Sequence, residues 1–585
     1  APADSPAPAD SPAPAGSPAT PEPADPAPDG EPGVGVEQSF FASGGDSLLA
    51  ARLASRARAE LSVDVSVRDV FEHPTVAALA AHLGGAAAVD GDRPGPVPRP
   101  ERVPASSAQR SLWFLHRLER HSPAYHIPLA AHLTGELDRD ALHAAVRDVQ
   151  QRHESLRTVF PPTGGAPWQR ILDEPAVPLH TPETTGSGLD DALAEAVRRP
   201  FDLESEPPWR LTLFTLGPRT HVLLLVLHHI AADEHALGPL TRDLSAAYAA
   251  RAVGRRAPVW PPLPLQYADF TLWQRARLGD GTGPDGVLGA ELAHWRATLA
   301  GAPAETPLPA DRPHPEEAVH PGAAVDFAWD AELAERLARF AAARGATVFM
   351  ALHAAVACLL SRLGAGTDLV LGTVTAGRED PALDELVGFF AQTLALRTDL
   401  SGDPGYAEVL DRVRAADLAA FAHQRAPFER VVEALAPPRA PGRHPLFQVM
   451  LTLHTGGAPR LTLPGLECAA LRLPRTTAKF PLLFDLTEDP GRGLHGCLEY
   501  STRMFDRDTA ALLVAALRRF VEAALDAPDT PYRTLRADEA VEEQALRTRT
   551  GGPDEPRAEH PAGRPAERPA EARADGGPRP GAAGG

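Results

Sequence analysis

The chain has 585 residues and a formal net charge of −20. This charge argues against nucleic acid as a partner, because phosphate contacts need clustered basic side chains. No apolar stretch approaches the roughly 20 residues of a membrane span, so we expect no membrane partner and interpret residues 347–360 as a core helix. The cysteines are few, widely spaced and odd in number, which predicts neither a metal site nor a disulfide framework. No signal peptide begins the chain, so we expect it to act in the cytoplasm.

Composition varies along the chain. Residues 1–32 form a repeat of Pro and Ala with acidic residues, and residues 545–585 consist mostly of Pro, Gly, Ala, Arg and Glu. Such segments cannot bury enough apolar surface to offset chain entropy, so we expect both to be disordered. Residues 84–102, rich in Gly, Ala and Pro, are typical of a linker. Lys479 is the only lysine, which we interpret as genomic compositional bias.

The first predicted element is a helix that follows the sequence Gly44-Gly45-Asp46-Ser47. The two glycines permit an unusual backbone turn, and apolar residues then recur every four positions as one helix face, at Leu49, Leu53, Ala57 and Leu61. Ser47 would lie at the helix start, where free N–H groups and the macrodipole favour a phosphodiester. The alternative is that Asp46 or Ser47 only caps the helix.

Residues 40–48, FFASGGDSL, are similar to the phosphopantetheine attachment site of peptidyl carrier proteins. This resemblance implies a small all-α helical bundle over residues 33–83. It also implies that Ser47 carries 4′-phosphopantetheine as a covalent cofactor, added by a phosphopantetheinyl transferase. Carrier domains of this type open with a helix of their own, and because residues 1–32 occupy that place, we expect the first carrier helix to be missing.

An apolar run at residues 222–227 predicts a buried strand, and the chain continues as HHIAADE. His228 and His229 therefore lie at a strand end, with the carboxylate of Asp233 four residues after the second. The ordinary pKa of histidine, about 6.5, suits proton transfer near neutral pH. Neighbouring strand residues point to opposite faces and cannot easily share a metal ion. Taken alone, however, two ordinary core histidines would give the same pattern.

This segment resembles the His-His-x-x-x-Asp-Gly signature of nonribosomal peptide synthetase condensation domains, with Glu234 in the Gly place. Five further segments match motifs of that family in the same order. Three residues depart from them: Ser111 replaces Arg, and Ala391-Gln392 replaces Val-Asn. The matching segments are residues 106–113, 152–158, 267–270 with Trp273, 387–394, and the last group of His423, 427–429 and 445–449.

The resemblance implies an α/β (α+β) condensation domain over residues 103–540. It would have two lobes, each similar to chloramphenicol acetyltransferase, with a tunnel between them. We expect the N-lobe over about 103–275 and the C-lobe over about 285–535. The resemblance implies His229 and His228 as catalytic residues, with His229 near the middle of the tunnel. The implied reaction is attack by the α-amine of an acceptor aminoacyl thioester on a donor peptidyl or aminoacyl thioester. His229 would take a proton while the tunnel aligns the reactants.

Further roles are implied for the residues around His229. Asp233 would be structural and pair with an arginine, for which Arg152 is our first candidate and Arg157 and Arg378 follow. We expect Glu234 to line the tunnel, narrow it, and help select or orient the acceptor amine. The implied partners are an upstream adenylation domain and downstream carrier and adenylation domains of the same assembly line, which is typical of secondary metabolism such as antibiotic or siderophore biosynthesis.

Two alternatives compete with this interpretation. An epimerisation domain shares the two-histidine signature and also follows a carrier, but it would carry a catalytic Glu near residues 374–378 and lack the first and last matching strings. A heterocyclisation domain is excluded, since aspartates would replace the histidines. The other alternative is a degenerate, non-catalytic platform that recruits tailoring enzymes. The changes at Ser111, Glu234 and Gln392 favour it, whereas the retained histidines and Asp233 oppose it.

Overall fold

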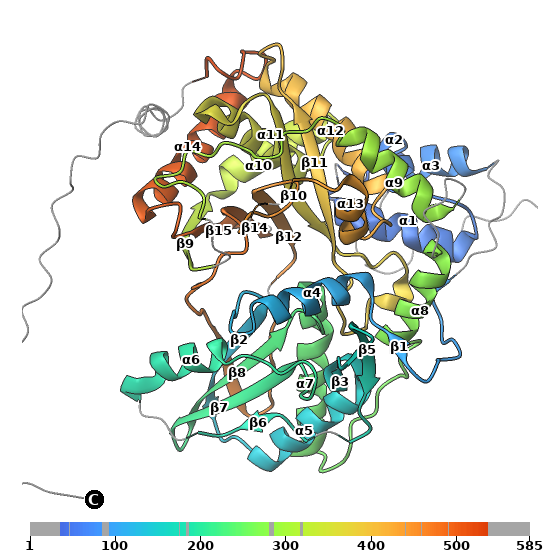
Figure 1. Cartoon of the computed structure of the whole chain (residues 1–585), viewed down its shortest axis with the longest axis vertical. Coiled ribbons are helices and arrows are strands. Elements are labelled where there is room, and N and C mark those ends of the chain that lie inside the picture. Colours follow the sequence, from blue (N-terminus) through green and yellow to red (C-terminus); the bar gives the residue numbers. More distant parts are fainter. Residues whose placement is uncertain are drawn as a thin grey trace, which may run out of the picture. The chain divides into compact units, whose positions relative to one another are not determined.

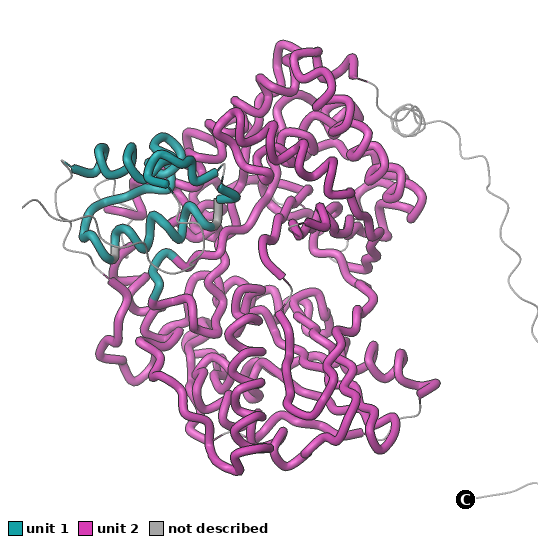
Figure 2. Tube along the Cα trace, turned by 180° about the vertical axis from the view of Figure 1, so that it is seen from behind, with its two compact units in different colours: residues 1–92, 379–381 teal, residues 93–378, 382–585 magenta. Residues whose placement is uncertain are grey.

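The computed structural model describes residues 35–535, apart from residues 42, 46, 85–92, 175, 183–185, 280–285, 316–319, 439, 441, 458 and 490. The predicted disordered segments 1–32 and 545–585, and residues 85–92 of the predicted linker, lie outside the described residues. The chain divides into two compact units, residues 1–92 with 379–381 and residues 93–378 with 382–585 (Figure 2).

The described part of the first unit is helical. It contains α1 (Ser47–Leu61), α2 (Val67–Glu72) and α3 (Val76–Leu83) (Figure 1). Ser66 caps α2 through a capping box with Asp69, and Thr75 caps α3, so each short helix begins at a residue that satisfies its free N–H groups. The rings of Phe41 and Phe71 lie 4.4 Å apart. They join the loop before α1 to α2.

The N-lobe of the second unit is built on a five-stranded sheet in the order β13-β2-β8-β7-β6. Side chains of its central strand, β8, alternate between two apolar clusters: odd-numbered residues pack with α5 and α7, and even-numbered residues with α4 and α6. Burial on both faces explains why this strand is a continuous apolar run. The elements are α4 (Ser107–Leu118), β2 (His126–Gly135), α5 (Arg139–Arg152), β6 (Leu179–His180), α6 (Leu189–Arg198), β7 (Trp209–Gly217), β8 (Thr220–His228), α7 (Leu237–Ala252) and β13 (Leu466–Leu471).

β13 comes from the C-terminal half of the chain. It pairs antiparallel with β2, from Leu466 opposite Gly135 to Leu471 opposite Ala130. The expected division into consecutive lobes is therefore wrong at this segment, because a strand within the expected C-lobe range completes the N-lobe sheet. Strand β13 mixes half-buried and exposed residues at the sheet edge, a pattern that does not specify which sheet the strand joins.

The C-lobe is built on a six-stranded mixed sheet in the order β11-β10-β12-β14-β15-β9. Helix α11 packs against α10, α12 and α14. The described residues include one helical stretch, Val348–Ala365, that is long and apolar enough to cross a membrane, and 83% of it is buried within the protein, as predicted for a core helix. The elements are β9 (Gly322–Trp329), α10 (Ala331–Ala343), α11 (Val348–Leu360), β10 (Asp368–Thr375), β11 (Gln392–Asp399), α12 (Tyr406–Ala422), β12 (Val449–Thr455), β14 (Leu482–Asp489), β15 (Gly493–Ser501) and α14 (Arg507–Asp526).

A third apolar cluster joins residues of the two expected lobes. Tyr267 and Phe270 of α8 pack with Leu383, Leu386 and Phe390. This contact holds the segment that precedes β11 against α8. The remaining elements are β1 (Val103–Pro104), β3 (Thr158–Val159), β4 (Pro162–Thr163) and β5 (Ala166–Ile171), with α8 (Tyr267–Leu278), α9 (Val287–Thr298), α13 (Phe428–Leu435) and the short helical turns η1 (Glu154–Arg157), η2 (Gly186–Gly188), η3 (Glu234–Ala236), η4 (Ser361–Ala365) and η5 (Pro381–Leu383).

Candidate active site

His228 is the last residue of β8 and lies inside the N-lobe. Only 2% of its surface is exposed, and its ring lies among those of His116, His126 and Phe201. The backbone N–H of Ile230 donates to His228 Nδ1 at 3.1 Å, which fixes the turn that follows the strand. Complete burial, with smaller contributions from nearby cationic groups, holds the pKa of His228 well below its ordinary value. His228 is therefore neutral at neutral pH.

His229 faces the C-lobe. Its backbone N–H donates to the carbonyl of Tyr125 at 2.9 Å, and its partly exposed ring lies 5.9 Å from the ring of Phe389. Its Nε2 lies 3.0 Å from Nζ of Lys479. Desolvation, followed by the charge of Lys479, holds the pKa of His229 well below its ordinary value. The imidazole is therefore in the neutral form that can accept a proton.

Asp233 is a buried anchor between the lobes. Its carboxylate accepts backbone N–H groups from Phe390 at 2.8 Å and Ala391 at 3.2 Å, and from Ala236 at 2.9 Å. A guanidinium nitrogen of Arg378 lies 3.3 Å away, and both side chains are only 3% exposed. Its own N–H donates to the carbonyl of Gly388 at 3.1 Å. Asp233 therefore holds the turn after His229 against the segment before β11.

Arg378 is thus the partner of Asp233, and our first candidate, Arg152, is wrong. Arg152 ends α5, and its Nε lies 2.7 Å from the carboxylate of Asp243 on α7, which takes the place expected for Asp233. Arg157 donates to the carbonyl of Leu172 at 2.6 Å and is not a partner either. Arg378 reaches Asp233 because the preceding Gly377 has φ +63°, and a Cβ there would lie 1.9 Å from the carbonyl oxygen of Phe390.

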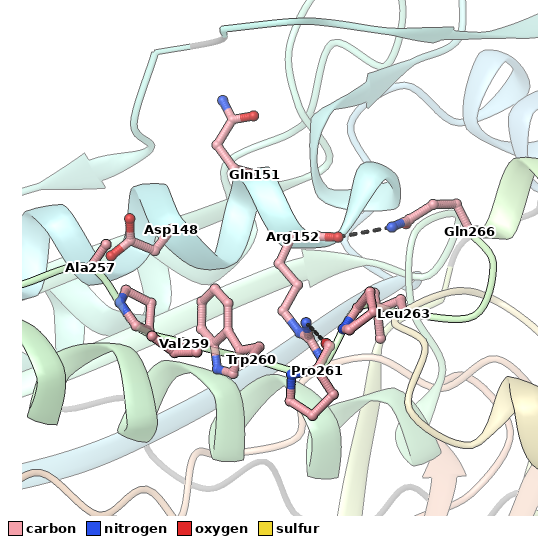
Figure 3. A pocket seen from close by; sticks show the side chains of 11 residues that line it. Asp148, Gln151, Arg152, Ala257, Val259, Trp260, Pro261, Leu263 and Gln266 are labelled. Carbon is pink, nitrogen blue, oxygen red and sulfur yellow. Dashed lines mark hydrogen bonds between the residues drawn. The ribbon is translucent and has the colours of Figure 1, made fainter.

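A pocket of about 540 Å³ lies beside Arg152 (Figure 3). Arg152 lies over the ring of Trp260 at 5.0 Å and donates to the carbonyl of Pro261 at 2.9 Å. The described lining residues include neither His229 nor Asp233. This pocket is therefore separate from the histidine site.

The segments predicted as motifs contact the turn after β8 or the segment before β11 that is joined to it. The side-chain amide of Gln109 donates to the carbonyl of Ile230 at 3.3 Å. The Ser155 hydroxyl donates to the carbonyl of Val387 at 2.7 Å, and the Tyr267 hydroxyl to that of Phe389 at 2.7 Å. Segments far apart in sequence therefore hold this turn and the segment before β11 to which Asp233 joins it, which gives the histidines a rigid support.

Glu234 reaches toward the C-lobe. Its side chain is 61% exposed, and its carboxylate lies 3.4 Å from Nε2 of His454. That nitrogen is also 2.8 Å from Asp485, which accepts a hydrogen bond from Arg475 at 2.6 Å. Desolvation lowers the pKa of His454, but the hydrogen bond to Asp485 and the charge of Glu234 outweigh it and raise that pKa above its ordinary value. Desolvation raises the pKa of Glu234, and His454 opposes the shift.

Lys479 is the site residue that sequence reasoning missed. It lies just before β14, and its Nζ is 5.8 Å from the centre of the Tyr125 ring in addition to its contact with His229. Desolvation lowers the pKa of Lys479, and the charge of Glu499 acts against this shift. The sequence offered one sign of its role: Lys479 is the single lysine among the 57 Lys and Arg residues, which we interpreted as compositional bias.

Ser47 is the first residue of α1, as the glycine pattern predicts. Gly44 has φ +90°, a conformation that glycine adopts without strain. Asp46 and the side chain of Ser47 lie outside the described part of the chain. Among the described residues, no group of three or more His, Cys, Asp or Glu side chains is placed to hold a metal ion.

A sequence model of the condensation domain matches residues 100–547, and one of the phosphopantetheine attachment site matches residues 28–83. The chain belongs to the condensation-domain family. The predicted family, its two-lobed fold and the presence of a phosphopantetheine attachment site are thereby confirmed. The match favours a condensation domain over the epimerisation alternative.

Curated relatives of this condensation domain are peptide and lipopeptide synthases. The dimodular nonribosomal peptide synthase of Bacillus subtilis is 46% identical over 510 residues, which cover 86% of this chain and 21% of that relative. The isonitrile lipopeptide synthase of Mycobacterium tuberculosis is 41% identical over 528 residues, which cover 88% of this chain and 21% of that synthase. The chain thus spans only a small part of the length of these relatives.

Two solved structures place the fold. The X-domain from teicoplanin biosynthesis, solved in complex with OxyB, is 39% identical with a TM-score of 0.72 and covers 76% of this chain and 98% of its own. The first condensation domain of the calcium-dependent antibiotic synthetase is 20% identical with a TM-score of 0.61, covering 75% of this chain and 99% of its own. At that identity the second likeness concerns the fold alone.

Proposed function

We propose that the condensation domain forms an amide bond between a donor acyl thioester on the carrier arm of Ser47 and the α-amine of an acceptor aminoacyl thioester. The observation that carries this proposal is the position of His229, a partly exposed residue at the end of β8 whose Nε2 faces the C-lobe and lies 3.0 Å from Nζ of Lys479. Its turn is anchored by the buried carboxylate of Asp233. A rigidly held neutral imidazole is suited to take the proton of an attacking amine.

The pKa of the attacking amine determines how much His229 must contribute as a base and how much the alignment of the substrates contributes. An α-amine has an ordinary pKa of about 7.7 to 8.0, so a useful fraction is already neutral near pH 7. His229 then has only to accept the proton released during attack. Alignment of the two arms contributes the larger part of the rate, as it does when a bimolecular step becomes intramolecular. His228 keeps the turn in shape from inside the N-lobe.

Ser47 suits the attachment of the arm. It begins a helix of 15 residues, whose first N–H groups favour an attached phosphodiester, and it follows a glycine turn at Gly44. The phosphopantetheine supplies the thiol that carries the acyl group as a thioester. A phosphopantetheinyl transferase and adenylation domains of the same assembly line would be the partners that prime and load the carriers, in the cytoplasm.

Amide formation is tested with purified components. The arm on Ser47 is loaded with candidate peptidyl groups, a separate aminoacyl carrier is added, and the product is identified by mass spectrometry. Ser47→Ala is the matched control and should take up no arm and form no product. An arm on the Ser47→Ala variant would show that another residue is modified. Absence of amide from a fully loaded wild type, across donors and acceptors, would refute the proposed reaction.

A second candidate function is a recruitment platform. It is favoured by the 39% identity to an X-domain that was solved in complex with OxyB, and by the departure at Glu234. In that case the folded domain would bind a tailoring enzyme and the His229→Ala variant would bind it equally well, with no amide formed by either. Amide formation that depends on His229 would exclude a purely non-catalytic role.

A further inference from the structure

Lys479 occupies the position in the site where an attacking nitrogen would meet His229. Its Nζ lies 3.0 Å from Nε2, and both side chains are partly exposed. Any group within hydrogen-bonding distance of Nε2 therefore enters the immediate neighbourhood of Nζ. Family motifs did not point to this residue, and the reaction proposed above uses only His229.

Charged groups surround the pair from both lobes. Glu499 of β15 and Asp485 of β14 are held by Arg475, at 3.3 Å and 2.6 Å. The charged groups that shift the pKa of Lys479 are Glu499, Arg475, Asp485 and Glu234. Those that shift the pKa of His229 are Lys479 and His126. The ring of Tyr125 also lies beside Nζ, and His228 precedes His229 in the sequence. Acidic groups on the C-lobe side thus favour a protonated Nζ, while burial opposes it.

The identity of the cation is informative. The chain uses Arg at every other one of its 57 cationic positions, so composition alone favours Arg here as well. Arg is a planar, permanently charged fork, whereas the lysine ammonium is a compact charge with three donors on a flexible stem. The single lysine therefore gives this site a donor that can turn from one acceptor to another in a confined space.

We propose that Lys479 is a catalytic residue of the condensation reaction, whose ammonium turns from His229 to the oxyanion that forms on the donor carbonyl. This inference rests on the proposed amide-forming function. Preorganised cationic donors aimed at a developing oxyanion are a principal source of rate acceleration in acyl transfer.

The steps balance without a further reactant. The acceptor nitrogen forms a bond to the donor carbonyl carbon, and the C=O electron pair moves to oxygen, where Lys479 donates a hydrogen bond. Nε2 of His229, released by the lysine, takes the proton from the acceptor nitrogen. Collapse of the intermediate breaks the C–S bond, and the departing sulfur takes the proton from the imidazolium. The products are an amide and a free thiol, with Lys479 still protonated and His229 neutral again.

The first test compares variants at position 479. Lys479→Met, close in size but uncharged, should lower amide formation by about 10²–10³-fold, as expected for loss of one oxyanion donor. Lys479→Arg should recover only part of this loss, because it restores the charge but not the compact donor. The matched control is Arg472→Met, a cation on the same segment that is 75% exposed and pairs with a 64% exposed Asp326. It should leave the rate and the melting temperature unchanged.

The pH profile separates a chemical role from a structural one. The charge of Lys479 lowers the pKa of His229, so Lys479→Met should raise that pKa and move the acid limb of the rate profile to higher pH. Lys479→Arg keeps the charge and should leave the limb in place. The proposal would be overturned if Lys479→Met were slower but the acid limb of its rate profile stayed at the wild-type pH. It would also be overturned if Lys479→Met were as fast as wild type.

The uniqueness of Lys479 provides a measurement that needs no turnover. Lysine labelled with ¹⁵N gives one side-chain resonance in this chain, so its titration can be followed directly. We expect that resonance to shift in His229→Ala, and to shift again when Ser47 carries a non-hydrolysable donor analogue. If the resonance shifts in neither case, the proposal for Lys479 is refuted even if the wild type forms amide. If the wild type forms no product, the amide-forming function itself is refuted.

Discussion

Replacing Asp233 by Ala should unfold the condensation domain at a lower temperature, because this carboxylate joins the two lobes. The change leaves the buried guanidinium of Arg378 without its anion. It also removes the acceptor of the N–H groups of Phe390 and Ala391. Arg378 retains the carbonyls of Leu383 and Leu386 as partners, so the charge is not left entirely unsolvated.

The magnitude follows from these lost contacts. Removing one member of a buried ion pair costs about 3–5 kcal/mol, since the remaining charge is uncompensated. For domains of the largest size surveyed, each kcal/mol lowers the melting temperature by about 2 °C, which predicts a fall of roughly 6–10 °C. The melting temperature of Asp233→Asn should lie between those of Asp233→Ala and wild type, because its amide oxygen can still accept the N–H of Phe390.

Differential scanning fluorimetry combined with amide formation per folded molecule measures the effect. Asp243→Ala is the matched comparison: it breaks the buried contacts with Arg152 and His153 at the end of α5. It should lose stability but keep its activity once folded. If Asp233→Ala melts like wild type yet forms no amide, Asp233 acts in the reaction directly and the structural account is wrong.

Three further outcomes follow. His229→Ala should lower amide formation by about 10²-fold, near the lower end of general-base contributions, with unchanged melting and carrier loading; a wild-type rate would remove His229 from the mechanism. Glu234→Gly should stay active and accept a wider range of acceptor arms, and Glu234→Gln separates charge from bulk; unchanged acceptor selectivity in both would reduce Glu234 to a tolerated substitution. The raised pKa of His454 predicts stability that is fully present below about pH 6.5 and is lost as pH rises through the raised pKa. Melting of His454→Asn across pH should lack this dependence, and an unchanged pH dependence would contradict it.

Local sequence signals predicted the parts of the site that depend on neighbouring residues. The apolar run before His228 specified a strand buried on both faces, and the position of the two histidines at its end follows directly. The partner of Asp233 could not be obtained in this way. Arg378 lies 145 residues away and reaches the site through a glycine turn, whereas Arg152 pairs with Asp243 of α7.

Contacts between segments far apart in the sequence also could not be predicted from local sequence patterns. Lys479 meets His229 across 250 residues, and a single lysine forms no motif. The absence of buried residues in β13 fits an edge strand but does not specify the sheet that it joins. Both cases depend on how the two halves of the chain assemble, which local propensity does not encode.

The donation of β13 to the N-lobe has a consequence for synthesis on the ribosome. When α7 is complete, one edge of β2 still lacks its neighbour, because Leu466–Leu471 has not been made. Roughly 200 residues must follow, which takes roughly 10–40 s at about 5–20 residues per second. During that interval an open strand edge can pair with another nascent chain. Polysomes that translate this protein should therefore be a point of co-translational aggregation, and a chaperone that covers sheet edges would act within this window.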